Sequence, residues 1–234
     1  MKRIFASRRT RWAAIVILIV LPAMLAAYSV FEFRRPNSFG EDHGFLNFFA
    51  NNSDWILGLL FLAISAVPFL LVFERRRPQA RELVPIAVMS ALAVVGRTVF
   101  SIVPLPNFKP CSAIIMITAI VFGPETGFLT GALTAFVSNF IFGQGPWTPW
   151  QMFAMGSIGW LAGVLYRKGV LRRSKLSLCI FGVIASTVIF GGIMNPASAL
   201  MWSESVNWKI IMSYYITGIP VDLVRAVATF AFLW

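Results

Sequence analysis

The stretch LVPIAVMSALAVVGRTVFSIV, residues 83–103, decides the fold class of this chain. It contains a single charged residue, Arg97, among side chains that are mostly apolar or small. A helix needs roughly 20 apolar residues to cross the hydrocarbon core of a bilayer, and apolar character on all sides distinguishes it from a barrel strand. The sequence therefore predicts a transmembrane helix over these residues.

Seven further stretches share this character, namely residues 12–31, 55–73, 111–122, 126–142, 149–166, 176–194 and 210–234. Of the 234 residues, 58% are hydrophobic and 12% are charged, whereas a soluble domain carries about 25% charged residues. We therefore expect an all-α polytopic membrane protein with eight helices. The run 111–122 would span only about 18 Å as a helix, so flanking residues or neighbouring helices must shield it.

The basic residues predict how the chain sits in the membrane. The 20 Lys and Arg residues outnumber the 9 acids, and 14 of the 20 fall in residues 2–11, 75–81 and 167–175. These segments are alternate connections between the predicted spans and therefore lie on the same side of the membrane, and cytoplasmic loops collect Lys and Arg. We expect a multi-pass protein of the plasma membrane with both termini in the cytoplasm. The accumulation of Lys and Arg in cytoplasmic segments then accounts for the net charge of +11, so we expect no nucleic-acid partner.

The N-terminus also allows a cleaved signal peptide, since a basic segment containing Arg8 and Arg9 precedes an apolar stretch that ends near Leu25-Ala26-Ala27. That stretch is about 19 residues long, against about 7–15 in a typical signal peptide, so we favour a retained helix. Cleavage would leave the later topology unchanged.

The sequence lacks the residues that several kinds of catalytic and metal site require. His43 is the single histidine and falls in a predicted outer loop, so no histidine-based metal site or catalytic dyad forms inside the membrane. No P-loop motif occurs, so ATP is not bound in that way. Cys111 and Cys179 are expected near opposite faces as packing residues. We predict neither an enzyme nor a bound cofactor or metal.

Three predicted outer loops carry unusual sequences: residues 104–110, residues 143–151 (GQGPWTPWQ) and residues 195–208. Proline restricts the backbone, so these loops are stiff, and they present aromatic and amide groups that suit a small organic ligand. An interfacial aromatic belt is the alternative. For Trp147 and Trp150 both interpretations stay open.

Charges also occur inside predicted spans. Arg97, Asp222 and Arg225 fall at similar depth, where a charge must pair or line a polar cavity. We favour an intramembrane ion pair in which Asp222 clamps Arg97 or Arg225 between helices. The alternative leaves one arginine to meet a ligand. One acid faces two bases, so positive charge remains in either case.

Small residues recur at intervals of four. Gly127, Gly131 and Ala135 share one face of their helix, which predicts close internal packing. Ala87 and Ala91 share a face of the first quoted stretch. For this second face, burial inside the bundle and docking to another subunit are equally allowed.

From about residue 83 the chain resembles the substrate-binding S component of energy-coupling factor (ECF) vitamin transporters. The resemblance rests on six predicted spans, on the Ala87-x-x-x-Ala91 motif, and on residues 138–152, which are similar to a loop in the cobalamin-type branch. It implies a six-helix S-component core at residues 83–234. Residues 1–82 would add a two-helix membrane extension that the core family lacks.

The resemblance implies a mechanism. The S component binds a vitamin from outside, docks through Ala87 and Ala91 on an energy-coupling T subunit with two ABC-type ATPases, and topples to release the ligand inside. Cobalamin is the first guess for the ligand. By position, the implied substrate-binding residues are Phe108, Lys109, Asn139, Gln144, Trp147, Trp150, Gln151 and Asn195.

Three other classes of protein compete with this interpretation. A self-sufficient secondary transporter would often show an inverted repeat, and the two halves of this chain do not match each other. A membrane enzyme would need a catalytic constellation that the sequence does not display. A purely structural anchor would leave the stiff outer loops without a purpose.

Overall fold

The computed structural model describes residues 8–34, 53–72, 80–203 and 207–234. Within these ranges the chain forms helices and no strand, which confirms the all-α prediction. Among the residues described, four helical stretches are long and apolar enough to cross a membrane: Trp12–Ser29, Leu83–Ile102, Lys175–Trp202 and Trp208–Leu233. His43 and the basic residues at 2–3 and 75–77 lie outside the described residues.

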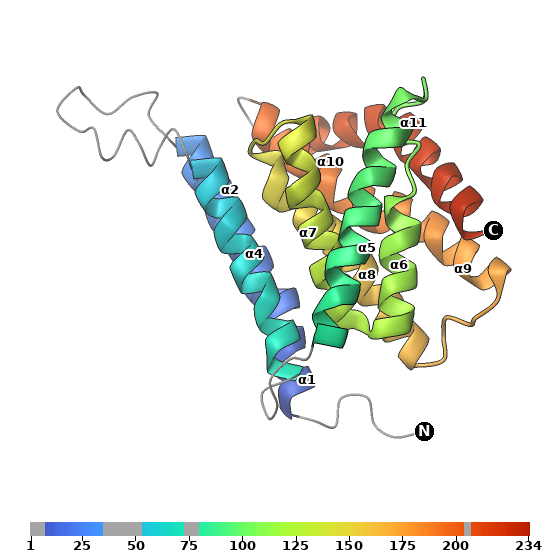
Figure 1. Cartoon of the computed structure of the whole chain (residues 1–234). Coiled ribbons are helices and arrows are strands. Elements are labelled where there is room, and N and C mark those ends of the chain that lie inside the picture. Colours follow the sequence, from blue (N-terminus) through green and yellow to red (C-terminus); the bar gives the residue numbers. More distant parts are fainter. Residues whose placement is uncertain (1–7, 35–52, 73–79, 204–206) are drawn as a thin grey trace.

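The N-terminal part forms two helical rods. The first is continuous through α1 (Arg8–Ile15), the π-helical turn η1 (Val16–Val20) and α2 (Leu21–Arg34). The second is α4 (Ser53–Val72). Figure 1 shows α2 and α4 side by side at one edge of the bundle.

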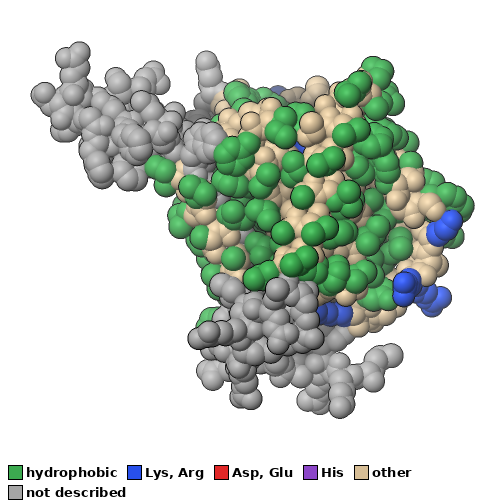
Figure 2. All heavy atoms as spheres, in the orientation of Figure 1, with side chains coloured by type: hydrophobic (Ala, Val, Ile, Leu, Met, Phe, Trp, Pro, Cys, Tyr) green, Lys and Arg blue, Asp and Glu red, His purple; other side chains and the backbone are tan. Residues whose placement is uncertain are grey.

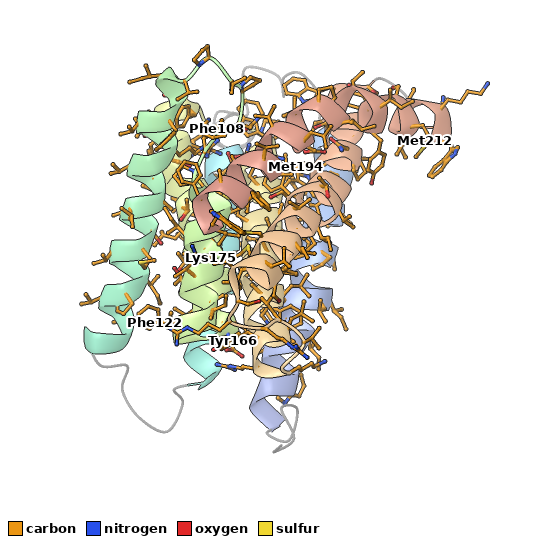
Figure 3. All side chains as sticks on the ribbon, turned by 90° about the vertical axis from the view of Figure 1, so that its right-hand side faces the viewer. Phe108, Phe122, Tyr166, Lys175, Met194 and Met212 are labelled. Carbon is orange, nitrogen blue, oxygen red and sulfur yellow. The ribbon has the colours of Figure 1, made fainter. Side chains whose placement is uncertain are left out.

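The remaining helices form the body of the bundle. Their bounds are α5 (Ala80–Val99), η2 (Phe100–Ile102), α6 (Cys111–Phe122), α7 (Pro124–Phe142), α8 (Trp147–Arg167), α9 (Lys175–Ile184), η3 (Ala185–Phe190), α10 (Gly191–Trp202) and α11 (Trp208–Leu233). Figure 3 shows Phe122 and Tyr166 near one end of the bundle, with Phe108 near the other. We call the end that carries Phe108 the loop end.

Two helices begin or continue where the sequence analysis placed loops. Helix α8 already starts at Trp147, because Pro146 and Pro149 stand before and within its first turn, where a helix needs no backbone donor. Asn195 lies inside α10, which extends η3 without a break. Trp147, Trp150, Gln151 and Asn195 are therefore helical residues and not loop residues.

Close packing between α7 and α8 depends on glycine. A Cβ added to Gly131 would lie 2.5 Å from the carbonyl oxygen of Met155, and one added to Gly159 would lie 2.4 Å from that of Gly127. Such distances leave no room for any side chain, so the two backbones touch, as small-residue faces permit in membrane helices. The predicted packing role of the glycine row in α7 is confirmed.

The N-terminal rods pack directly on this α7–α8 pair. Ile17, Leu21 and Phe61 are fully buried and belong to the same apolar cluster as Phe128 and Met152. The first two rods are therefore joined to the bundle by apolar contact. A division of function between residues 1–82 and 83–234 stays a prediction.

The surface between the two ends of the bundle is apolar. Figure 2 shows mostly hydrophobic side chains across one face, with Lys and Arg near its lower right. Helix α5 contributes Val84, Val88, Leu92 and Val95 to this surface, each about half exposed. A monomeric soluble protein rarely shows an apolar surface of this extent, whereas a bilayer requires one.

Candidate functional site

A cavity of about 370 Å³ lies at the loop end, between α5, α6, α8, α10 and α11. Its volume falls in the range of roughly 300–1,000 Å³ that is usual for small-molecule sites. Apolar walls come from Met155, Phe190 and Met194. The charged and amide side chains on its wall are Arg97, Asn107, Lys109, Gln151, Asn195, Asp222 and Arg225.

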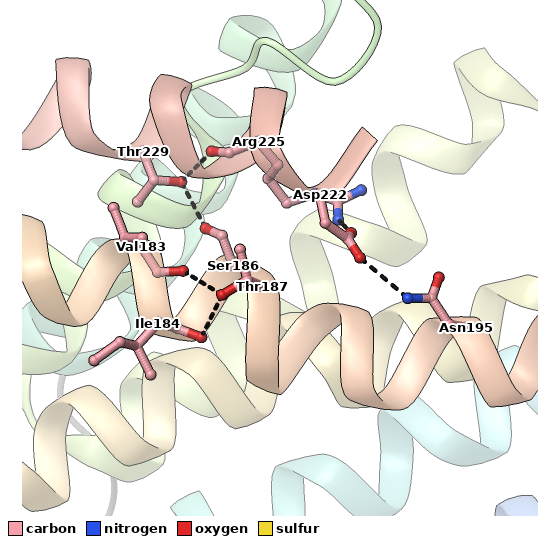
Figure 4. A network of polar contacts seen from close by, with 8 residues as sticks. All are labelled: Val183, Ile184, Ser186, Thr187, Asn195, Asp222, Arg225 and Thr229. Carbon is pink, nitrogen blue, oxygen red and sulfur yellow. Dashed lines mark hydrogen bonds and ion pairs between the residues drawn. The ribbon is translucent and has the colours of Figure 1, made fainter. Parts of the chain in front are cut away.

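One side of the cavity carries an ion pair that is already satisfied. Arg225 donates from Nη1 to Oδ1 of Asp222 at 2.8 Å, and Asn195 donates from Nδ2 to Oδ2 of the same carboxylate at 3.1 Å. The Arg225 guanidinium also lies over the ring of Phe190, 3.8 Å from its centroid. Both carboxylate oxygens of Asp222 are thus occupied, as Figure 4 shows.

This pair differs from the interhelical clamp that the sequence analysis favoured. Asp222 and Arg225 are three residues apart on α11, so their pairing stays within one helix. The link between helices comes from Asn195 of α10 and from Ser186, which shares a 2.9 Å hydrogen bond with Thr229 (Figure 4). Arg97 takes no part in this network.

Arg97 belongs to a second network, which joins three helices. From α5 it donates from Nη1 to the hydroxyl of Ser138 and, at 3.1 Å, to Oδ1 of Asn139 on α7. Asn139 in turn donates to Thr148 at 3.0 Å and to Oε1 of Gln151 at 3.1 Å on α8. Asn139 is 1% exposed and lies behind the cavity wall, where it orients Arg97 and Gln151, which line the wall.

Lys109 and Arg97 meet at one aromatic ring. The Nζ of Lys109 lies 4.6 Å from the centroid of Phe142, and Cζ of Arg97 lies 4.8 Å from the same centroid. Burial, followed by the neighbouring Arg97, lowers the pKa of Lys109 below its usual value. In the part of the chain that the structure describes, neither cation has an acidic partner within 4.0 Å.

Of the eight predicted substrate-binding residues, Lys109, Gln151 and Asn195 line the cavity. Trp147 does not line the cavity itself but stacks on Trp202, which forms part of the wall, with ring centroids 6.0 Å apart. Gln144 donates to the carbonyl of Phe136 and accepts from Thr148.

The other two predicted aromatic residues lie away from the wall. Phe108 packs against Phe100 and Phe232, with centroids 6.4 and 5.7 Å away. Trp150 packs against the apolar cluster that α7 and α8 share with the N-terminal rods, and its Nε1 is buried without a hydrogen-bond partner in the described structure.

The sequence analysis missed one wall of the cavity. Tyr214, Thr217 and Val221 line it from α11 at spacings of three and four residues, on the same helical face as Arg225, which the sequence analysis had singled out. The sequence feature that could have revealed this wall is the recurrence of polar side chains at this spacing within an apolar run. Cys111, expected only to pack, also lines the wall.

Ala87 and Ala91 are exposed on the outer face of α5, beside Val88 and Leu92. Of the two alternatives left open for these alanines, burial inside the bundle is therefore wrong. The face that they form is free to meet lipid or another membrane protein.

A bundle with an apolar surface and a polar, ligand-sized cavity at one end defines a membrane-embedded protein that binds a small molecule. The family model described as "ECF-type riboflavin transporter, S component" matches residues 78–233. The chain therefore belongs to this family of substrate-binding transporter subunits, and the predicted S-component family is confirmed.

Curated relatives match about half of the chain. A UPF0397 protein of Vibrio atlanticus is 26% identical over 125 residues, covering 51% of this chain and 68% of the relative. A UPF0397 protein of Clostridium perfringens is 26% identical over 123 residues, covering 50% of this chain and 65% of the relative. No solved structure gives a significant match.

Proposed function

We propose that this chain is the substrate-capturing subunit of an ECF-type importer in the plasma membrane. The loop end would face outward, with both termini in the cytoplasm, and the cavity would take up a micronutrient from outside. The observation that carries the proposal is the cavity of about 370 Å³ with aromatic, amide and charged groups at one end of an otherwise apolar bundle.

Size favours one class of ligand. The cavity lies at the lower end of the range for drug-sized molecules, so it suits a flavin or another compact ring system with polar substituents. A flavin is therefore our first class of ligand, in line with the description of the family model, and riboflavin and its 5′-monophosphate are the members to test. Cobalamin, which residues 138–152 suggest by resemblance, has a macrocycle that would extend well beyond this volume, and it is the second ligand to test.

Delivery would require partner proteins. The exposed Ala87 and Ala91 leave a shallow face on α5 where the backbone of another helix can approach closely. We assign this face to docking on a T subunit that carries two ABC-type ATPases, which would supply the energy for release of the ligand inside.

Two measurements test the proposal. The protein is purified in detergent, the copurifying small molecule is identified by mass spectrometry, and binding of riboflavin and of cobalamin is measured by titration. We expect a bound micronutrient and saturable binding with one ligand per chain. Absence of any bound or binding small molecule would overturn the proposal.

Reconstitution separates an S component from a self-sufficient carrier. Vesicles that contain this chain alone should not accumulate ligand, whereas vesicles with the T subunit, the ATPases and ATP should. Equal uptake without partners would favour the secondary transporter.

A further inference from the structure

The charges on the cavity wall do not balance. Three cations and one carboxylate line the wall, and the carboxylate of Asp222 is paired with Arg225 and hydrogen-bonded by Asn195. This leaves Arg97 and Lys109 without an acidic partner in the described residues. A cation withdrawn from water is costly unless it is paired, so two adjacent ones call for a compensating group.

The arrangement of these two cations favours an anion that enters from the cavity. Among the hydrogen bonds of the described chain, Arg97 uses Nη1 alone, toward Ser138 and Asn139, although a guanidinium carries five N–H donors. Its remaining donors form the fork that binds a carboxylate or a phosphate through two parallel hydrogen bonds. Lys109 contacts the same Phe142 ring as Arg97 and lines the same cavity, so an anion in the cavity can draw on both cations.

Buried partners hold the pair in place. Ser138 and Asn139 are fully buried on α7, and they hold one edge of the Arg97 guanidinium. Phe142, one turn further along α7, has its ring centroid 4.8 Å from Cζ of Arg97 and 4.6 Å from Nζ of Lys109. An arginine held in this way loses little rotamer entropy on binding, which favours a tight and specific contact.

We propose that Arg97 and Lys109 form an anion subsite, and that the ligand of this protein carries a carboxylate or phosphate group. The inference rests on the proposed function and names the chemical class of its substrate. The satisfied pair of Asp222 and Arg225 forms the neutral side of the same cavity, where the uncharged part of the ligand would lie.

Riboflavin and its 5′-monophosphate provide a matched pair of probes, because they share the ring system and differ by the phosphate. Dissociation constants are measured by quenching of flavin fluorescence on the purified chain in a maltoside detergent, which itself carries no phosphate. We expect the monophosphate to bind about tenfold or more tightly than riboflavin, since a hydrogen bond to a charged group contributes about 1.5–3 kcal/mol.

Lys109→Gln is the decisive variant, because Lys109 lies in the loop before α6 and is only partly buried. It should reduce the preference for the monophosphate, because it weakens binding of the monophosphate more than binding of riboflavin. Lys109→Arg should keep the preference. Lys209→Gln removes an exposed lysine that does not line the cavity, so it should change neither affinity.

Three results would overturn the anion subsite: equal affinities for both flavins in the unmodified chain, an equal loss for both in Lys109→Gln, or a neutral molecule as the copurifying ligand. If neither flavin binds, the copurifying molecule provides the test. An anionic molecule supports the subsite, and a neutral one refutes it. If no small molecule binds or copurifies, the proposed function itself fails.

The phosphate of a lipid headgroup offers the same chemistry. Reconstitution in phosphatidylglycerol nanodiscs distinguishes this source. Loss of the flavin monophosphate preference there, together with Lys109-dependent retention of phosphatidylglycerol through purification, would assign the cations to lipid and refute a soluble anionic ligand.

Discussion

Replacing Asn139 with leucine tests whether the network behind the cavity wall holds it in shape. The amide accepts from Arg97 at 3.1 Å and donates to Thr148 at 3.0 Å and Gln151 at 3.1 Å, and the residue is 1% exposed. Leucine removes these three hydrogen bonds and keeps a similar volume.

The expected loss in the free energy of unfolding follows from the kinds of hydrogen bond that the substitution removes. A neutral hydrogen bond contributes about 0.5–1.5 kcal/mol and one to a charged group about 1.5–3 kcal/mol, while measured values between membrane helices average about 0.6 kcal/mol. Two neutral bonds and one to Arg97 therefore give a loss of about 3 kcal/mol. For a chain of this size that lowers the unfolding midpoint by roughly 5–10 °C.

The control is Thr130→Val on the same helix. Thr130 is 0% exposed, and its hydroxyl has no hydrogen-bond partner in the described structure, so its loss should leave the midpoint unchanged or slightly raised. Both variants are compared by intrinsic tryptophan fluorescence during heating in detergent. The reasoning fails if the two variants shift the midpoint by the same amount.

A double-mutant cycle assigns part of the effect to one bond. Gln151→Ala removes the acceptor that Asn139 uses on α8, so the two substitutions should be less than additive by about 0.5–1 kcal/mol. Additive losses would show that Asn139 stabilises the chain by some other contact.

Ala87→Trp should abolish copurification with the T subunit and its ATPases while ligand binding in detergent is kept, because the bulky ring blocks close helix approach. Val227→Trp, at an exposed position on α11, should assemble normally. If both variants assemble, the docking face is wrongly assigned. Leu105→Cys at the loop end should react with a membrane-impermeant maleimide in intact cells, whereas Val170→Cys at the opposite end should react only after lysis, and the reverse pattern would invert the proposed topology; the native cysteines are buried. Binding of flavin monophosphate should weaken as pH rises through the lowered pKa of Lys109, since the ammonium attracts the phosphate only while protonated, and Lys109→Gln should flatten this alkaline dependence. An unchanged profile in Lys109→Gln would contradict the role of the lysine.

Some of the site could be predicted from the sequence because its signal is local. Lys109 lies in a proline-framed loop between two apolar runs, and Arg97 and Asp222 stand out as charges inside such runs. Charges of this kind must pair or face a polar space wherever the helices pack. The structure places all three on the cavity wall.

Other parts depended on contacts that no local signal records. Trp147 and Trp150 looked alike in a proline-framed stretch, yet one stacks against a wall residue and the other packs into an apolar cluster. Both lie on α8, which starts at Trp147, whereas the prolines of this stretch led the sequence analysis to expect a loop. The α11 wall was detectable from the spacing of Tyr214 and Thr217, but the apolar residues around them dominated the pattern.

The sequence by itself determined that this chain is an all-α membrane protein, since hydrophobic length is a property of each segment, and its motifs pointed to the S-component family. Only the tertiary structure decided that Asp222 pairs with Arg225, while Arg97 and Lys109 are left to face the cavity without an acid. The reason is that the partner of a charge is set by the rotation and register of helices distant in sequence. A segment's composition constrains neither of these.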